Sequence, residues 1–183
     1  MPHTDIAQQI VDAFRDVPFP ADGYDIYAAQ TDDDYGQPRF TTDHLPGRHW
    51  QEITPEQLLD CQAAFSHLRP DGWRHYLPAA LLLEINQPYS NIDVIWILSE
   101  GTGELQQRQK VRHDTLDGPQ VAAVVGLLEY YITRERNIHA AHAHHRYAKN
   151  GIVWTEELEP ADLESAVAAL AYWKRRQERL GPG

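Results

Sequence analysis

The segment "TPEQLLDCQAAFSHL", residues 54–68, contains the clearest helix signal in the chain. Thr54 can cap the helix, Pro55 suits its first position, and Gln57 stands three residues after the cap. Apolar side chains follow at helical spacing: Leu58, Cys61, Phe65 and Leu68. The segment therefore predicts a helix with one buried side, and a cysteine within that side is expected in the core rather than as a nucleophile.

Helical periodicity also occurs at both ends of the chain. Residues 5–16 read as an amphipathic helix capped by Thr4, and residues 160–180 as a last helix that is acidic at its start and basic at its end. A long helix is predicted from Pro119 to the stop signal Asn150-Gly151. The apolar run at residues 92–98 fits a strand or a helix, and its helical neighbours favour a helix.

Residues 17–49 are rich in Pro, Gly and Asp and lack a sustained period, which predicts a long ordered loop. A short strand at "YDIYA", residues 24–28, is an option within it. The expected fold is therefore mainly α: a single compact domain over residues 1–183, with five or six helices and a long acidic N-terminal loop laid over them.

Composition limits the classes of function. The formal net charge is −11 at pH 7, which argues against non-specific nucleic-acid binding because phosphate contacts need Lys and Arg. No apolar run is long enough to span a membrane, and no signal peptide is visible at the N-terminus. Cys61 is the single cysteine, so no intrachain disulfide can form and a cytoplasmic location is expected.

The negative charge is concentrated near the N-terminus. Residues 1–60 hold 12 acidic and 3 basic side chains, whereas residues 61–183 hold 15 and 13. Solubility alone accounts for such a bias, and the alternative is a docking face for a basic protein. The residues predicted to form that face are Asp22, Asp25, Asp32, Asp33 and Asp34, with Trp50 pinning the acidic loop to the body.

Histidines are concentrated in "RERNIHAAHAHH", residues 134–145. In a helix, Glu135, His139 and His142 share one face, which is a spacing that a divalent metal such as zinc can use. Only residue type marks His75, His113 and Asp114 as further ligands. The flanking arginines favour two other interpretations, a solvated helix end projecting over residues 134–150 and a surface that responds to pH.

Patterns typical of catalysis are missing. The chain has no Gly-rich phosphate loop, no Gly-x-Ser-x-Gly motif and no metalloprotease motif. We therefore predict a non-catalytic cytoplasmic binding protein with no cofactor, of which an immunity protein that neutralises a basic toxin is one form. The alternative hypothesis is a metal-dependent hydrolase that uses the His-rich helix.

Two strings, "AFRDVPFP" (13–20) and "GRHWQEITPEQLLDCQAAFSHLRPDGWRHYLPAALL" (47–82), resemble an uncharacterised bacterial family catalogued only as a domain of unknown function. The matching positions are Ala13, Phe14, Val17, Trp50, Glu52, Ile53, Tyr76, Leu77, Pro78, Ala79, Gln120, Tyr172 and Trp173. The resemblance covers most of the chain outside residues 134–150. It implies a compact helical domain, and it carries no activity and no site.

Overall fold

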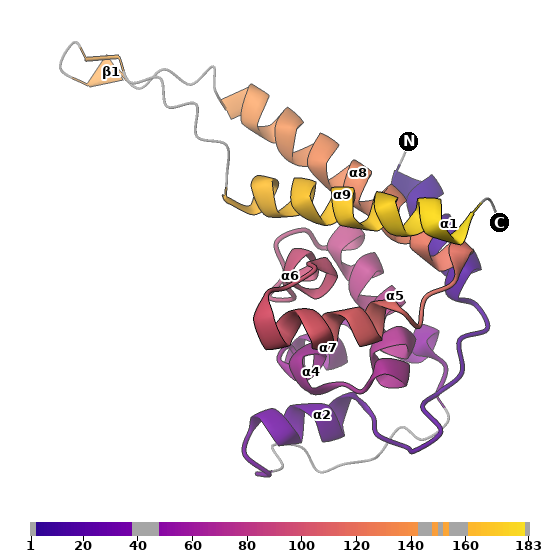
Figure 1. The fold of residues 1–183 in the computed structure, drawn as a ribbon. Coiled ribbons are helices and arrows are strands. Elements are labelled where there is room, and N and C mark those ends of the chain that lie inside the picture. Colours follow the sequence, from indigo (N-terminus) through magenta and orange to yellow (C-terminus); the bar gives the residue numbers. More distant parts are fainter. Residues whose placement is uncertain (1–2, 38–47, 143–147, 150–151, 154–160, 182–183) are drawn as a thin grey trace.

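The protein is mainly helical (Figure 1), as the sequence predicts. The computed structural model describes residues 3–37, 48–142, 148–149, 152–153 and 161–181. In chain order its elements are α1 (His3–Phe14), α2 (Ile26–Asp33), the 3-10 helix η1 (Trp50–Glu52), α3 (Pro55–Asp60), α4 (Ala64–His67), α5 (Pro70–Asn86), α6 (Val94–Leu98), α7 (Gly103–His113), α8 (Gly118–His142), β1 (Ala148–Lys149), β2 (Ile152–Val153) and α9 (Ala161–Leu180).

The described residues form nine α-helices rather than the five or six predicted, because the structure contains several very short helices. The capping box between Thr54 and Gln57 is present, and α3 begins at Pro55 as predicted. The chain then tightens at Cys61, whose N–H bonds to the carbonyl of Leu58 three residues back, at 3.2 Å. This turn separates α3 from α4, so the single helix predicted over 54–68 is two helices.

The end of α4 is bound by a side chain from α7. The Arg112 guanidinium donates to the carbonyls of Ser66 and Leu68, at 2.9 and 2.8 Å from Nη2. Arg112 is buried, and it satisfies carbonyls that the short helix leaves without partners. A cation at a helix C-terminus is also favoured by the helix dipole.

The segment predicted as a loop over 17–49 contains α2, so the loop prediction is wrong for residues 26–33, as is the option of a strand at 24–28. Asp25 caps α2, because its carboxylate accepts a hydrogen bond from the N–H of Ala28 at 2.8 Å. Ile26 and Ala29 are buried, and the side chain of Gln30 accepts from the N–H of Ala63 at 3.1 Å. Contacts with α4, rather than a sequence period, therefore stabilise this helix. Residues 38–47 of the predicted loop lie outside the described residues.

The helix predicted to run to residue 150 is shorter. The described part of α8 ends at His142, and β1 and β2 pair as antiparallel strands with Ala148 opposite Val153 and Lys149 opposite Ile152. Residues 92–98 do contain a helix, α6, whose cap is Asp93. The Asp93 carboxylate accepts from the N–H of Trp96 at 2.8 Å.

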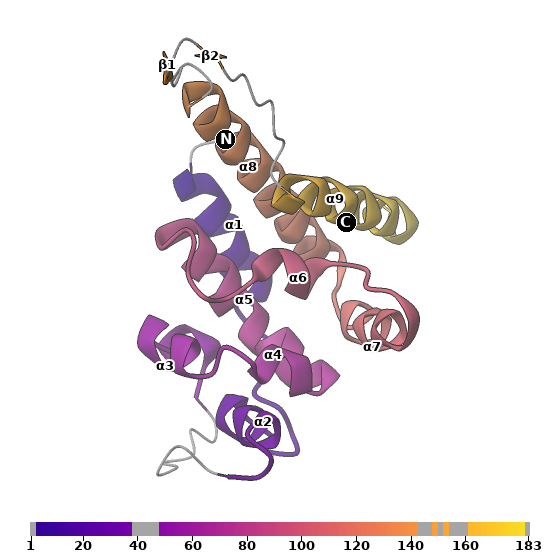
Figure 2. The same cartoon turned by 90° about the vertical axis from the view of Figure 1, so that its left-hand side faces the viewer.

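The helix α8 packs between α1 and α9, as Figures 1 and 2 show from two directions. Gly126 allows α1 to approach, because a Cβ there would lie 3.0 Å from the side-chain oxygen of Gln9. The buried apolar side chains form one cluster, to which α1, α2, α5, α8 and α9 all contribute. Indole N–H groups tie distant segments together: Trp50 donates to the Phe14 carbonyl at 2.7 Å and Trp173 to the Leu98 carbonyl at 2.8 Å.

Candidate docking surface

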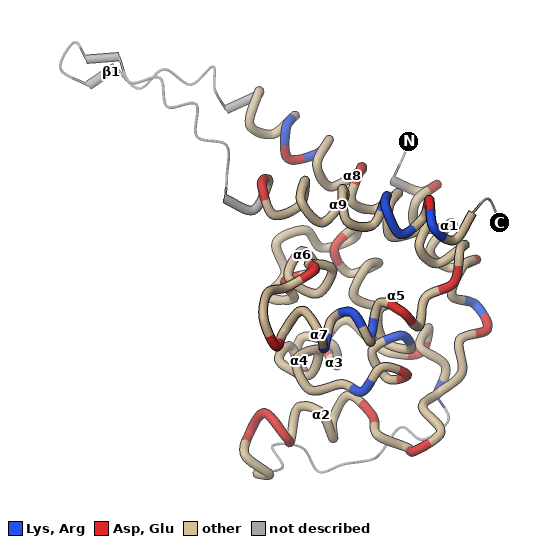
Figure 3. Tube along the Cα trace, in the orientation of Figure 1, with Lys and Arg blue, Asp and Glu red and all other residues tan. Residues whose placement is uncertain are grey.

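One end of the molecule is rich in carboxylates, and Arg69 and Arg112, which lie outside its two segments, contact it. Residues 16–37 and 49–68 contain nine Asp or Glu and no Lys or Arg. They form α2, η1, α3 and α4, which lie near one another at one end of the fold (Figure 2). Acidic residues mark α2 there, whereas Lys and Arg cluster on α9 at the other side of the molecule (Figure 3). We call residues 16–37 and 49–68 the acidic end.

Three of the predicted docking residues contact side chains of the protein itself. Asp22 accepts from the backbone N–H of Tyr24 and pairs with Arg69, and both contacts lower the pKa of its carboxyl group, the backbone bond most. Asp32 accepts from the hydroxyl of Tyr24. The carboxylate of Asp33 lies 3.2 Å from Nε2 of His67. Asp22 and Asp32 thus contact Tyr24 just before α2, and Asp33 links α2 to α4.

Two other predicted docking residues are inside the protein. Asp25 is 1% exposed as the cap of α2, and Trp50 is 2% exposed as the first residue of η1. Neither can contact a partner directly. Asp34 is partly buried at the end of α2.

Three exposed carboxylates of the acidic end were not selected from the sequence: Glu52, Glu56 and Asp60. Among the described residues, none of the three pairs with a Lys or Arg. The pKa of Glu56 is lowered by hydrogen bonds from its own backbone N–H and from Thr54, which favours the charged form. The signal that would have found them is the lack of any Lys or Arg over residues 49–68.

The predicted metal ligands are separated by their surroundings. Glu135 is buried and its carboxylate accepts from Nε of Arg134 at 2.9 Å and from the hydroxyl of Tyr89 at 3.2 Å. His139 is exposed on α8, and the side chain of His142 lies outside the described part. Among the described side chains, no group of three or more His, Cys, Asp or Glu is placed to hold a metal ion. Glu135 is thus already bound within the protein.

The further ligands suggested by residue type have structural roles. His113 is fully buried between Trp73 and Trp173, and its Nδ1 lies 3.0 Å from the hydroxyl of Tyr172. Burial lowers the pKa of His113 to about 3, so its ring is neutral at pH 7. His75 is also buried, which lowers its pKa. Asp114 is exposed and pairs with Lys110 and Arg176.

Two buried carboxylates share one guanidinium between α5 and α8. Nη2 of Arg134 lies 2.6 Å from Glu84 and 2.9 Å from Glu135. Desolvation by burial raises the pKa of Glu84 despite the opposing effect of Arg134. The guanidinium also stacks over the ring of Tyr131, 4.9 Å from its centre. This cluster links two helices of the core.

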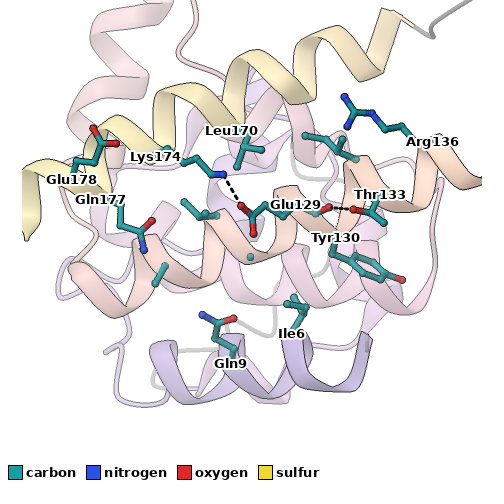
Figure 4. A pocket seen from close by; sticks show the side chains of 14 residues that line it. Ile6, Gln9, Glu129, Tyr130, Thr133, Arg136, Leu170, Lys174, Gln177 and Glu178 are labelled. Atoms are coloured by element: carbon teal, nitrogen blue, oxygen red, sulfur yellow. Dashed lines mark hydrogen bonds and ion pairs between the residues drawn. The ribbon is translucent and has the colours of Figure 1, made fainter. Parts of the chain in front are cut away.

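A groove of about 760 Å³ lies over α8 between α1 and α9 (Figure 4). Ile6 and Gln9 line one side, and Leu170 lies on the other. Lys174 of α9 reaches Glu129 of α8 at 2.7 Å, and Arg136 and Glu178 add one charge of each sign. Because its charges are balanced, this groove offers no electrostatic preference, in contrast to the acidic end. No described helix is long and apolar enough to cross a membrane.

Comparison with other proteins places the chain in a family. Searches of curated proteins and of solved structures give no significant match. A family model matches residues 2–176, a range that includes the His-rich residues 134–150, which the resemblance seen in the sequence left out. The chain therefore belongs to the family of unknown function DUF6714.

Proposed function

We propose that this protein is a non-catalytic binding protein that docks a basic protein on its acidic end. The observation that carries the proposal is the presence of nine acidic residues and no Lys or Arg over residues 16–37 and 49–68. A surface of one sign accelerates encounter with a partner of the opposite sign and disfavours partners of the same sign.

The docking contacts assigned to the partner are the exposed carboxylates Asp32, Glu52, Glu56 and Asp60. Glu52, Glu56 and Asp60 lie along η1 and α3, whose backbone is fixed by the capping box and by the buried Trp50 and Leu58 beneath. A rigid frame reduces the entropy lost when the partner binds. Asp25 and Trp50 therefore support the face from inside instead of touching the partner.

An immunity protein that masks a basic toxin fits this description, because rapid capture of a toxin benefits from complementary charge. Such a protein would act in the cytoplasm. Burial raises the pKa of Cys61 to about 12, so the single thiol is neutral and unreactive in its core position, which suits a binding protein rather than a thiol enzyme.

The test is affinity capture followed by a binding measurement. The purified chain is immobilised and exposed to lysate of its own source cells at low ionic strength, and retained proteins are identified by mass spectrometry. A basic protein retained by the wild type is then purified and titrated against a triple variant, Glu52→Gln, Glu56→Gln and Asp60→Asn. We expect the dissociation constant to rise about tenfold or more, and added salt to weaken the wild-type complex.

A matched control separates the position of the charges from their number. The variant Glu104→Gln, Glu164→Gln and Glu178→Gln removes three exposed acids from α7 and α9 and has the same net charge as the docking variant. This control should bind like the wild type. Equal weakening in both variants, or no protein retained by the wild type above the level of the docking variant, would refute the proposal.

A further inference from the structure

The groove over α8 contains apolar side chains from three helices. Val125 and Gly126 of α8 line it together with Ile6 of α1 and Leu170 of α9. Val167 stands three residues before Leu170, on the same side of α9, and is 42% exposed. None of the buried polar atoms that lack a partner in the described part of the chain lines this groove. The groove therefore offers apolar area without the unpaired polar groups that a small molecule would satisfy, and it suits a protein surface.

The two ends of the groove carry opposite charges. Figure 4 shows Arg136 and Glu178 on opposite sides of the pair formed by Lys174 and Glu129. The chain direction agrees, because α8 and α9 run in opposite directions (Figure 1), Arg136 follows Glu129 on α8 and Glu178 follows Lys174 on α9. Arg136 and Glu178 are both exposed, and neither pairs with an opposite charge among the described side chains. Each end of the groove therefore has a charge available to another molecule.

This arrangement of charges is complementary to itself. A two-fold axis across the middle of the groove exchanges its ends, and in a two-fold dimer every contact between two residues occurs twice. Arg136 of one copy then faces Glu178 of the second copy, and Glu178 of the first faces Arg136 of the second. Two neutral or two like-charged ends would not give this match.

We propose that the groove receives a second copy of this chain, with α9 of each copy lying in the groove of the other. Val167, Ala168 and Ala171 are exposed on one face of α9, and their small side chains let another helix approach closely. The apolar face of α9 would cover Leu170 and Val125 of the second copy.

The distribution of charge over the molecule favours this face for self-association. Two copies with a net charge of −11 each repel one another, and the acidic end would add most to that repulsion. The groove lies beside α9, where Lys and Arg cluster (Figure 3), away from the acidic end. Since exposed ion pairs contribute little, we expect a dissociation constant of about 10–100 μM. At a few micromolar or less the chain is then mainly a monomer.

The test is sedimentation equilibrium of the untagged full chain at concentrations from about 5 to 500 μM, with charge reversals at the two ends of the groove. Arg136→Glu and Glu178→Arg each place like charges in both contacts, so each should weaken the dimer about tenfold. The variant that combines Arg136→Glu with Glu178→Arg restores opposite charges and should dimerise within about threefold of the wild type.

Matched controls lie on α7, outside the groove. Arg108→Glu and Glu104→Arg reverse exposed charges and give the same net charges as the two groove variants. Each control should dimerise more tightly than the groove variant of equal net charge, and circular dichroism verifies that all variants fold. A wild type that stays monomeric at every concentration, or a double variant that is not restored, would overturn the proposal. The inference does not rest on the acidic end: the triple acidic variant should still dimerise.

Discussion

The guanidinium of Arg134 lies 2.6 Å from the carboxylate of Glu84 and joins α8 to α5 inside the protein. The same guanidinium also pairs with Glu135, so two buried carboxylates depend on one cation. A buried carboxylate that loses its partner keeps its desolvation penalty and loses the electrostatic attraction that offset this penalty. Removal of Arg134 would leave Glu84 and Glu135 as buried carboxylates without a cation. We expect this penalty to be the main effect of the cluster on the free energy of unfolding.

Replacement of Arg134 by Met should lower the free energy of unfolding by about 3–5 kcal/mol. The side chains of Arg134 and Glu84 are only 13% and 7% exposed, so solvent screens the pair little. Urea denaturation followed by circular dichroism measures the change. Arg136→Met is the control, because Arg136 is exposed two residues further along α8. Similar losses in the two variants would contradict a special role of the Arg134 cluster.

Replacement of Glu84 by Gln should change how stability depends on pH. Burial raises the folded-state pKa of Glu84 above its unfolded value, so the folded state binds this proton more tightly than the unfolded state. The stabilising contribution of the proton is complete below the unfolded pKa, roughly 4.3, and is lost as pH rises through the folded pKa. The unfolding free energy of the wild type should therefore fall relative to Glu84→Gln as pH rises from about 4 to 7. A constant difference over that range would exclude a raised pKa.

His113 should make the protein sensitive to acid. Its folded-state pKa of about 3 lies below the unfolded value of roughly 6.5, so the unfolded state binds more protons between these pH values. The contribution of His113 to the free energy of unfolding is therefore complete above about pH 6.5. It decreases by about 1.4 kcal/mol for each pH unit below that value. As pH falls below about 6.5, the free energy of unfolding should decrease more steeply for the wild type than for His113→Asn, by this amount per pH unit. Denaturant unfolding at several pH values measures the difference. The exposed His139→Asn serves as the control and should follow the wild-type slope.

Zinc binding, if present, should not depend on Glu135. Its carboxylate is occupied by Arg134 and Tyr89, so Glu135→Gln should leave zinc affinity within about twofold of the wild type. Isothermal titration of protein purified without a histidine tag measures this affinity. A loss of tenfold or more in the variant would restore Glu135 as a ligand.

Local sequence signals predicted part of this fold well. The capping box at Thr54 and the burial of Leu58, Cys61, Phe65 and Leu68 follow from residue type and spacing, and the structure confirms both. The break between α3 and α4 could not be read in the same way. It lies at residues 61–63, where the N–H of Ala63 donates to the side chain of Gln30, a residue of α2 that is far away in the sequence.

The acidic surface was predictable in composition and not in detail. Counting charges along the chain locates the excess of acid, but the roles of Asp25 and Trp50 depend on α2 and on the packing of η1. Asp25 becomes a buried cap only because α2 forms, and α2 lacks a sequence period that would reveal it. Glu56 gives no separate signal, because an acidic residue in the first turn of a helix is explained by the helix dipole.

The contact between Arg112 and the end of α4 also constrains the order in which the chain can fold during synthesis. Arg112, whose guanidinium binds the carbonyl of Leu68, is synthesised 44 residues after Leu68. A ribosome releases the chain from the N-terminus, so the acidic end is exposed before α7 has emerged. A nascent chain that ends before Arg112 would lack the contact that binds the carbonyls at the end of α4. Such a fragment should be cut by proteases at residues 61–69. A fragment that includes α7 should resist cleavage there.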